Sequence, residues 1–312
     1  MANTYGKVSG TFQEIDNAYG KVSGTWQEAD EIYAKVSGTW ELVFAAFEAT
    51  SFTTLSSGSG TFSVPDQANA IHVQFAVGGG GGAFRGASYD KAGGESAGAG
   101  GGSGGYVSDQ IYSVTQGETI SYSIASGGAP NNNVSERYNG SASAGTNTTL
   151  SGSSAGSLFT LNGGGGASAS GGGVQGPLRS NTAGTAGTAS IAATPITSGN
   201  FRDSDGTTKA VTTNTSGPVG TFNQSGNGVA GANPGNCGGD NCQIGGGTGG
   251  SSYAGNVSGG AGSPQGGSTG GTAGTRGSGG GGGGAQYGSE NTTAAGATGG
   301  NGEIKYRFLR VN

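Results

Sequence analysis

Long glycine runs constrain this chain more than any other feature, because a run of glycines supplies no side chains for a hydrophobic core. Glycine accounts for 74 of the 312 residues, in runs such as Gly78 to Gly82 and the long stretch from Gly266 to Gly284. Such a composition is typical of disordered low-complexity chains. Only 10% of the residues are charged, however, and strand-like segments separate the runs. We therefore expect an ordered body.

The glycine runs leave two structural alternatives open once collagen is excluded. A collagen triple helix needs a strict G-X-Y repeat and much proline, whereas the chain has only 7 prolines. A flexible linker is the simple alternative. The other is a set of extended left-handed helices with three residues per turn, which have no internal hydrogen bonds and can bond to one another side by side. We predict that the segments between such helices form loops at the ends of a bundle.

A 14-residue sequence repeats three times at the N-terminus, beginning at Tyr5, Tyr19 and Tyr33. Each copy reads as a strand, a Ser-Gly turn and a second strand, and the turn glycine can adopt the positive φ of a tight hairpin. We predict three β-hairpins in residues 1–48, which attach the protein to a partner, followed by a glycine-rich body in residues 49–312. The recurring aromatic residues are the predicted attachment residues: Tyr5, Phe12, Tyr19, Trp26, Tyr33 and Trp40.

The body shows the two-residue period of half-buried strands. In the segment 71–77 we expect Ile71, Val73, Phe75 and Val77 on the buried face, and His72 on the less buried face as a solvent-facing or locally bonded residue. Similar patterns occur in residues 61–64, 106–124, 157–161 and 303–311. The predicted fold is mainly β: an antiparallel β-sandwich with packed polyglycine-type helices and little or no α-helix.

Catalytic and cofactor sites find little support in the sequence. A single histidine and two neighbouring cysteines cannot build more than one nucleophilic centre or a zinc site, and no phosphate-binding GxxxxGK[ST] motif occurs. We therefore predict no enzyme activity, no cofactor and no metal site. Asp203 and Asp205 are expected in a solvated turn, with bound Ca²⁺ as the minor alternative. Cys237 and Cys242 can close a small disulfide loop or remain two thiols.

Charge and hydropathy narrow the classes of partner. The formal net charge is −5 with 13 scattered basic residues, which is unlike a nucleic-acid-binding protein. No apolar run is long enough to span a membrane, and the N-terminus lacks the pattern of a secretion signal. We expect the protein to be made in the cytoplasm of its producing cell and to be released from it as part of a particle.

Four segments together resemble the glycine-rich domain of phage tail-fibre and other virion proteins. They are TFSVP from Thr61, IHVQFAVGGGGG from Ile71, GGSGGYVSDQIYSVTQGETISYSIASGG from Gly101 and GGNGEIKYRFLRV from Gly299. The plan is also similar to that of T-even-type tail-fibre tip adhesins. This resemblance implies a virion location, attachment to other virion proteins through the N-terminus, and loops that bind a host surface protein or glycan. It also implies that the chain is either a trimer or bound to a trimeric fibre.

The resemblance leaves the function open between two classes. The first is a receptor-binding tail-fibre or tail-tip adhesin; the second is a structural virion component, such as a head fibre or capsid decoration protein. An ice-binding protein is a more distant alternative, hinted at only by the TAGTAGTAS segment from Thr182. Aromatic and arginine residues between the glycine runs are the predicted receptor contacts: Arg85, Tyr89, Arg137, Tyr138, Phe201, Arg202, Tyr253 and Tyr287.

Overall fold

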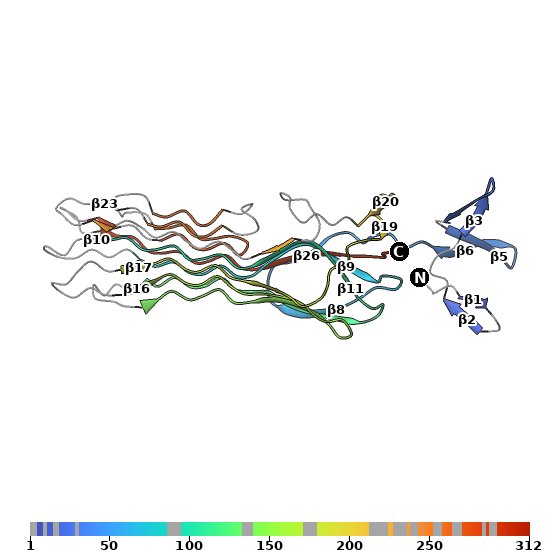
Figure 1. Cartoon of the computed structure of the whole chain (residues 1–312), viewed down its shortest axis with the longest axis horizontal. Helices are drawn as coiled ribbons and strands as arrows, with labels where there is room; N and C mark the ends of the chain where they lie inside the picture. The colour runs from blue at the N-terminus through green and yellow to red at the C-terminus, as the bar shows by residue number, and fades with distance from the viewer. Residues whose placement is uncertain are drawn as a thin grey trace.

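A computed structural model describes the chain over fifteen stretches, which are separated by short gaps. They are residues 5–8, 11–14, 19–28, 31–85, 95–132, 140–170, 180–211, 224–226, 236–237, 243–244, 246–251, 258–263, 270–282, 285–286 and 292–312. Within these stretches the chain is mainly β and contains no helix of the α type. The molecule is elongated, with hairpins at one end, a β-sandwich in the middle and a glycine-rich bundle at the other end (Figure 1). None of the described residues belongs to a helix that could cross a membrane.

The N-terminal repeats form three separate β-hairpins, as predicted. They are β1 (Tyr5–Val8) with β2 (Thr11–Glu14), β3 (Tyr19–Val22) with β4 (Thr25–Glu28), and β5 (Glu31–Val36) with β6 (Thr39–Ala45). In the second and third hairpins the turn residues have positive φ angles, 52° and 90° at Ser23 and Gly24 and 49° and 93° at Ser37 and Gly38. Two consecutive positive φ angles define the type I′ turn, which suits the twist of a tight hairpin.

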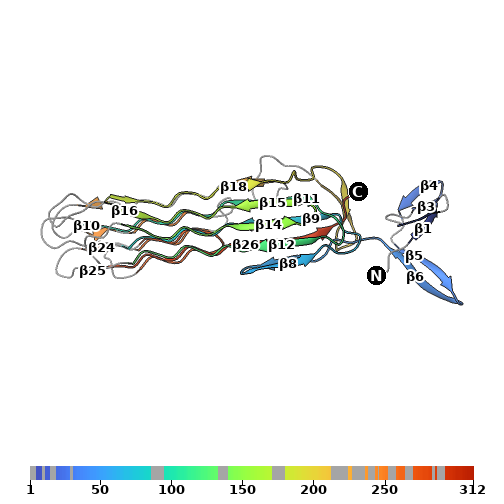
Figure 2. The same ribbon diagram turned by 90° about the horizontal axis from the view of Figure 1, so that it is seen from below.

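Two five-stranded antiparallel sheets form the sandwich (Figure 2). The first sheet has the order β21-β11-β9-β26-β7 and the second has the order β18-β15-β14-β12-β8. Strands of the first sheet are β7 (Thr53–Leu55), β9 (Ala70–Val77), β11 (Tyr106–Ser113), β21 (Gln224–Gly226) and β26 (Glu303–Leu309). Strands of the second are β8 (Ser59–Ser63), β12 (Thr119–Ser123), β14 (Thr148–Gly152), β15 (Gly156–Leu161) and β18 (Ala189–Ile191).

The main hydrophobic core lies between the two sheets. Fully buried residues of both sheets meet there, among them Ile71, Val107 and Ile304 from the first sheet and Leu150 and Phe159 from the second. A second, smaller cluster covers the outer face of the first sheet, where Phe201, Ile111 and Leu309 pack together. The first sheet is therefore buried on both faces, which accounts for the apolar residues on both sides of β9.

A β-bulge in β9 corrects the predicted alternation of this strand. Phe75 pairs with Lys305 and Val73 with Tyr306, so Gln74 is an extra residue opposite two consecutive residues of β26. Because an extra residue reverses the side-chain alternation, Phe75 leaves the face of Ile71 and Val73, and Ala76 takes its place in the core. The prediction that Phe75 and Val77 share the face of Ile71 and Val73 is therefore wrong.

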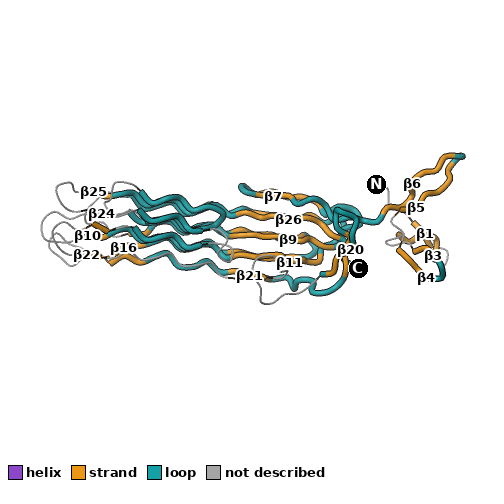
Figure 3. Tube along the Cα trace, turned by 90° about the horizontal axis from the view of Figure 1, so that it is seen from above, coloured by secondary structure: helices purple, strands orange, loops and turns teal. Residues whose placement is uncertain are grey.

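Several glycine-rich tracts continue directly from a strand of the sandwich, whereas the described tracts in 246–250, 258–263 and 270–282 are not joined to one. The tract 78–85 follows β9, the tract 98–105 leads into β11, and the tract 162–167 follows β15. Figure 3 shows strands that pass without interruption into parallel, wavy tracts. The sandwich therefore holds the tracts that continue from its strands side by side, and this reduces the conformational entropy that their ordering would otherwise cost.

Backbone hydrogen bonds identify the tracts as helices with three residues per turn. In tract 78–85 the N–H groups of Gly78, Gly81 and Phe84 donate to Gly105, Gly102 and Ala99, at 2.9, 2.7 and 3.0 Å. The N–H groups of Gly79 and Gly82 donate to a second neighbour, and those of Gly80 and Ala83 to a third. Every third residue thus faces the same neighbour, which is the geometry of the extended left-handed helix. The predicted polyglycine-type bundle is confirmed.

The bundle is packed as a hexagonal array. Tract 78–85 bonds to six others, and neighbouring tracts of this ring also bond to one another: 98–105, 162–167, 142–147, 125–131, 294–302 and 277–282. A second ring surrounds tract 277–282 and consists of 78–85, 98–105, 246–250, 258–263, 270–275 and 294–302. The described part of the bundle therefore satisfies its backbone groups between tracts rather than within them.

Close backbone approach explains why the inner positions are glycine. A Cβ atom added to Gly81 would lie 1.9 Å from the carbonyl oxygen of Gly165, and one added to Gly80 would lie 1.9 Å from that of Ser278. The outward positions instead carry side chains: Thr182, Thr185 and Thr188 are exposed along one edge tract. Within each tract, glycine therefore marks the faces that lie inside the bundle, and residues with side chains mark the face that lies outside.

Candidate functional site

The end of the bundle away from the sandwich carries several short strands. These are β10 (Glu95–Ser96), β13 (Gly140–Ser141), β16 (Ser168–Ser170), β17 (Ser180–Thr182), β22 (Asn236–Cys237), β23 (Gln243–Ile244), β24 (Ala285–Gln286) and β25 (Thr292–Thr293). They form three small antiparallel sheets at this end (Figures 1 and 2). We call the end that they define the distal end.

A small hydrophobic cluster lies under the distal end. Phe84 is 1% exposed and packs with Ala99, Ala167 and Ala169. It is a bulky side chain in a bundle otherwise built almost without side chains, and its backbone pairs with Asn131. The cluster anchors the point where tract 78–85 ends, so the chain leaves the bundle at Arg85 from a fixed position, with the Arg85 N–H bonded to the Asn131 carbonyl at 3.0 Å.

The predicted receptor contacts do not all lie together. Arg85 is at the distal end, at the last hydrogen bond of its tract. The described residues that flank the segments 86–94, 133–139 and 287–291 also lie at the distal end, while Ser251, which precedes 252–257, accepts a hydrogen bond from Ser103 close to β11. Five predicted contacts lie outside the described residues: Tyr89, Arg137, Tyr138, Tyr253 and Tyr287.

Phe201 and Arg202 lie near the opposite end, on a hairpin of β19 (Asn200–Arg202) and β20 (Thr208–Ala210). Phe201 is 2% exposed within the smaller hydrophobic cluster, so we correct its assignment from receptor contact to core residue. Arg202 forms an ion pair with Glu48, at 3.1 Å between Nε and Oε1. Its backbone carbonyl accepts the N–H of Ala49. These residues hold the body to the segment that follows the N-terminal hairpins.

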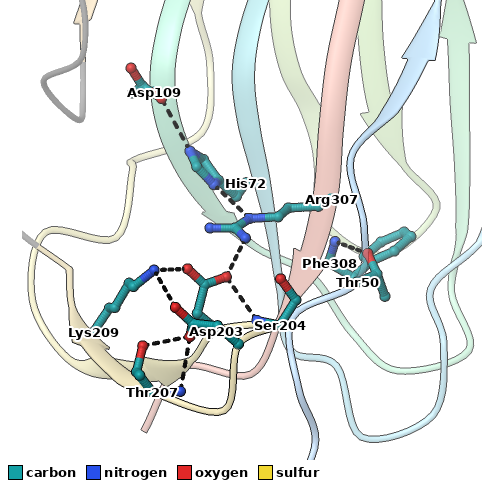
Figure 4. A network of polar contacts seen from close by, with 10 residues as sticks. Thr50, His72, Asp109, Asp203, Ser204, Thr207, Lys209, Arg307 and Phe308 are labelled. Atoms are coloured by element: carbon teal, nitrogen blue, oxygen red, sulfur yellow. Dashed lines mark hydrogen bonds and ion pairs between the residues drawn. The ribbon is translucent and has the colours of Figure 1, made fainter.

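A polar network, buried apart from Lys209, continues from this hairpin into the first sheet (Figure 4). We call it the polar junction; it consists of His72, Asp109, Asp203, Lys209 and Arg307. Arg307 donates from Nη1 to Asp203 at 2.5 Å and from Nε to His72 Nδ1 at 3.2 Å. Lys209 also donates to Asp203. The guanidinium group of Arg307 lies over the rings of Phe52 and Phe201, 4.5 and 5.5 Å from their centroids.

The chemistry of these contacts fixes the protonation of His72. Because Nδ1 accepts a hydrogen bond from Arg307, the proton of the neutral ring is on Nε2, which faces Asp109 Oδ1 at 3.4 Å. Burial lowers the pKa of His72; the hydrogen bond to Asp109 opposes this shift, and the charge of Arg307 adds to it. Neutral His72 thus fits between a buried cation and a carboxylate.

Asp203 is the anionic centre of the polar junction. Burial alone would raise the pKa of Asp203, but hydrogen bonds from Lys209, from the Ser204 N–H and from Arg307 outweigh this effect and lower that pKa to about 2. Asp203 and Asp205 both contact the Lys209 ammonium group, which therefore takes the place that a bound cation would need. The arrangement favours the predicted turn over the Ca²⁺ alternative. Only Asp205 is solvated as predicted, however, since Asp203 is 7% exposed and lies inside the polar junction. No metal-ligating group of His, Cys, Asp and Glu occurs among the described residues.

The prediction that His72 lies on the less buried face of its strand needs a correction. His72 does lie on the face of β9 opposite Ile71 and is locally bonded, yet only 3% of its surface is exposed. The sequence pattern of β9 could not show that the distant hairpin of β19 and β20 covers this face. Arg307, and its pairing with Asp203, were missed for the same reason, although the alternation of Ile304, Tyr306 and Phe308 already placed Arg307 on that side of β26.

The predicted attachment residues lie on the N-terminal hairpins, at the other end of the molecule from the distal end (Figures 1 and 2). Trp40 and Tyr33 are 67% and 50% exposed, the large hydrophobic residues most exposed within the described part of the chain. Tyr5, Phe12, Tyr19 and Trp26 occupy equivalent strand positions. Cys237 lies in β22, while Cys242 lies outside the described residues, so the disulfide stays a prediction.

Comparison with known protein families gives a match that covers the body and does not extend to the N-terminal hairpins. A family model described as a glycine-rich domain matches residues 53–309, which include both sheets and every tract of the bundle. No curated protein matches this sequence.

Proposed function

Since this chain belongs to the glycine-rich domain family, we propose that it is a phage virion protein of the tail-fibre or tail-tip adhesin class. In this proposal the N-terminal hairpins attach to other virion proteins, and the distal end presents its loops to a protein or glycan on the host surface. The proposal assigns no reaction and no cofactor to the chain.

The observation that carries the proposal is the separation of two different surfaces by a hydrogen-bonded rod. Exposed aromatic residues occur on the hairpins, while the points where the tracts end occur at the distal end (Figure 1). An adhesin must bind its particle and its receptor at the same time, so its two binding surfaces have to lie apart. This arrangement suits that task better than it suits an enzyme, which needs a concave site that encloses its substrate.

The bundle also suits the presentation of variable loops. Each inner tract bonds to six neighbours through its backbone, and the small cluster around Phe84 adds a side-chain contact under the distal end. A loop that connects two tracts can therefore change in sequence without altering the scaffold that holds it. Loops on a rigid scaffold are where recognition residues commonly occur.

Binding of the labelled full chain to a panel of bacterial strains tests the proposal. We expect saturable binding to some strains, lost in a variant with Tyr89, Arg137, Tyr138 and Tyr287 changed to alanine. The matched control changes Thr185 and Thr188 to alanine on the exposed side of the bundle, away from the distal end, and this variant should bind as the native chain does. Incorporation into particles without binding to any permissive host would contradict the adhesin function and favour a head fibre or decoration protein.

A further inference from the structure

The three N-terminal hairpins are copies of one structural module. Each is a two-stranded sheet joined by a Val-Ser-Gly-Thr segment, and the second and third have the same pair of positive φ angles in the turn. In each hairpin, a lysine of the first strand lies directly opposite an aromatic residue of the second strand. These cross-strand pairs are Lys7 with Phe12, Lys21 with Trp26 and Lys35 with Trp40.

In the third hairpin the paired side chains are open to solvent. Directly opposite residues of an antiparallel pair lie on the same face, so Lys35 and Trp40 are neighbours on one surface. Both are exposed, and Tyr33, two residues before Lys35, adds a second exposed aromatic ring to that face. Among the described residues of the body, large aromatic side chains such as Tyr112, Phe159 and Tyr306 are buried in the sandwich. A tryptophan that is 67% exposed therefore points to a surface that another molecule covers.

The hairpins also have a physical reason to bind a partner. No strand of one hairpin joins the sheet of another in the described part of the chain. A two-stranded hairpin is marginally stable in water, and its edges are open to further pairing or packing. Contact with a partner would stabilise all three hairpins in a similar way, because all three carry a lysine opposite an aromatic residue at equivalent positions.

We propose that the three hairpins are three equivalent docking modules and that the partner is a protein with three copies of one site. Each site is an apolar pocket for the aromatic ring with carboxylates at its rim for the neighbouring lysine. This inference rests on the attachment role in the proposed function, and adds the number and chemistry of the sites.

Three linked modules predict binding that depends on all of them. Linking binding sites raises the apparent affinity on the order of 10²- to 10⁴-fold for each added site when the geometry allows all to engage. Loss of any one aromatic residue should therefore weaken binding by a similar large factor, whichever hairpin carries it. A single dominant hairpin would give a different pattern, in which two of the three changes have no effect.

The test measures binding of the full chain to particles purified from a phage that lacks the gene for this chain. The variants are Phe12→Ala, Trp26→Ala and Trp40→Ala, alone and combined. We expect each single variant to lower the apparent affinity on the order of 10²-fold and the triple variant to show no binding. Trp40→Phe and Thr39→Ala are the controls in the third hairpin and should bind nearly as the native chain does. Binding of every variant to host cells should be unchanged, since the distal end is intact.

Three results would overturn the inference. The triple variant could bind particles as well as the native chain, or one aromatic residue alone could account for all binding. The native chain could also form oligomers in sedimentation experiments that the triple variant does not form, which would make a second copy the occupant. If the native chain binds no particles while it still binds host cells, the attachment role fails together with this inference, and the recognition role stands.

Discussion

Replacing Gly81 by alanine should disrupt the packing at the centre of the bundle and destabilise the protein. The added Cβ atom would lie 1.9 Å from the carbonyl oxygen of Gly165, a distance that no carbon and oxygen atom can keep without a bond. Tract 78–85 would have to move away from its neighbour by more than an ångström. This movement disturbs the hydrogen bond from Gly81 to Gly102, at 2.7 Å, and that from Gly280 to Gly81, at 3.1 Å.

The expected loss can be worked out from these two bonds. Disrupting each bond leaves a buried group without a partner, which costs about 1–3 kcal/mol. Alanine also restricts the unfolded chain, which returns roughly 0.4–1 kcal/mol. With one such group at each of the two bonds, the free energy of unfolding should fall by about 1–5 kcal/mol, and the midpoint of thermal unfolding on the order of 10 °C. Amide hydrogen exchange should accelerate in all six neighbouring tracts.

Gly270→Ala provides the matched control, because it makes the same chemical change on the exposed side of the bundle. There the nearest atom to an added Cβ is the Ala295 carbonyl oxygen, at 3.1 Å, and a small shift can relieve this contact. We expect a change in the free energy of unfolding within about 0.5 kcal/mol. Equal effects of Gly81→Ala and Gly270→Ala would refute the close-packed bundle.

Three further changes test other parts of the structure. Phe201→Ala should lower the free energy of unfolding by about 3–5 kcal/mol in a denaturant titration, because it leaves a cavity in the smaller cluster; a change below 1 kcal/mol would contradict its burial. Asp203→Asn should lower the free energy of unfolding by about 3 kcal/mol, because it leaves the buried Arg307 without its carboxylate. Asp205→Asn, at the exposed neighbouring acid, should change the free energy of unfolding little. Because folding lowers the pKa of His72, the contribution of this residue to the free energy of unfolding is complete above the unfolded pKa of 6.5. It is lost as the pH falls below that value. Thermal unfolding at pH 7.5 and pH 5 should show this loss, and His72→Gln should reduce it; an unchanged pH dependence would exclude His72 as its source. The pKa of Asp203, about 2 against an ordinary 3.8, adds a second loss of stability between about pH 4 and pH 2.

The sequence predicted the parts of the fold that local patterns determine. Glycine after serine at regular intervals marks the hairpin turns, and the φ angles of Gly24 and Gly38 bear this out. Alternating apolar residues mark most strands of the sandwich. The bundle could be predicted as a class of structure, because only glycine allows its backbone spacing. Which tract lies beside which could not be predicted, since that depends on the order of strands in the two sheets.

Contacts between distant segments account for what the sequence did not reveal. The bulge at Gln74 depends on pairing with β26, more than two hundred residues away, and no local signal marks it. The polar junction joins Arg307 to His72, 235 residues away, and to Asp203, 104 residues away. Phe201 illustrates the same limit: an aromatic residue beside an arginine in a loop-like sequence resembles a recognition site, yet it fills the smaller hydrophobic cluster.

Nuclear magnetic resonance couplings across hydrogen bonds test the central claim most directly. With uniform ¹⁵N and ¹³C labelling, the amide nitrogens of Gly78, Gly81 and Phe84 should couple to the carbonyl carbons of Gly105, Gly102 and Ala99. The nitrogens of Gly79 and Gly82 should couple to Thr146 and Ser143 in another tract. Couplings that repeat every three residues would establish the packed three-residue helices. Couplings that repeat every two residues with one neighbour, or none at all in this tract, would contradict them.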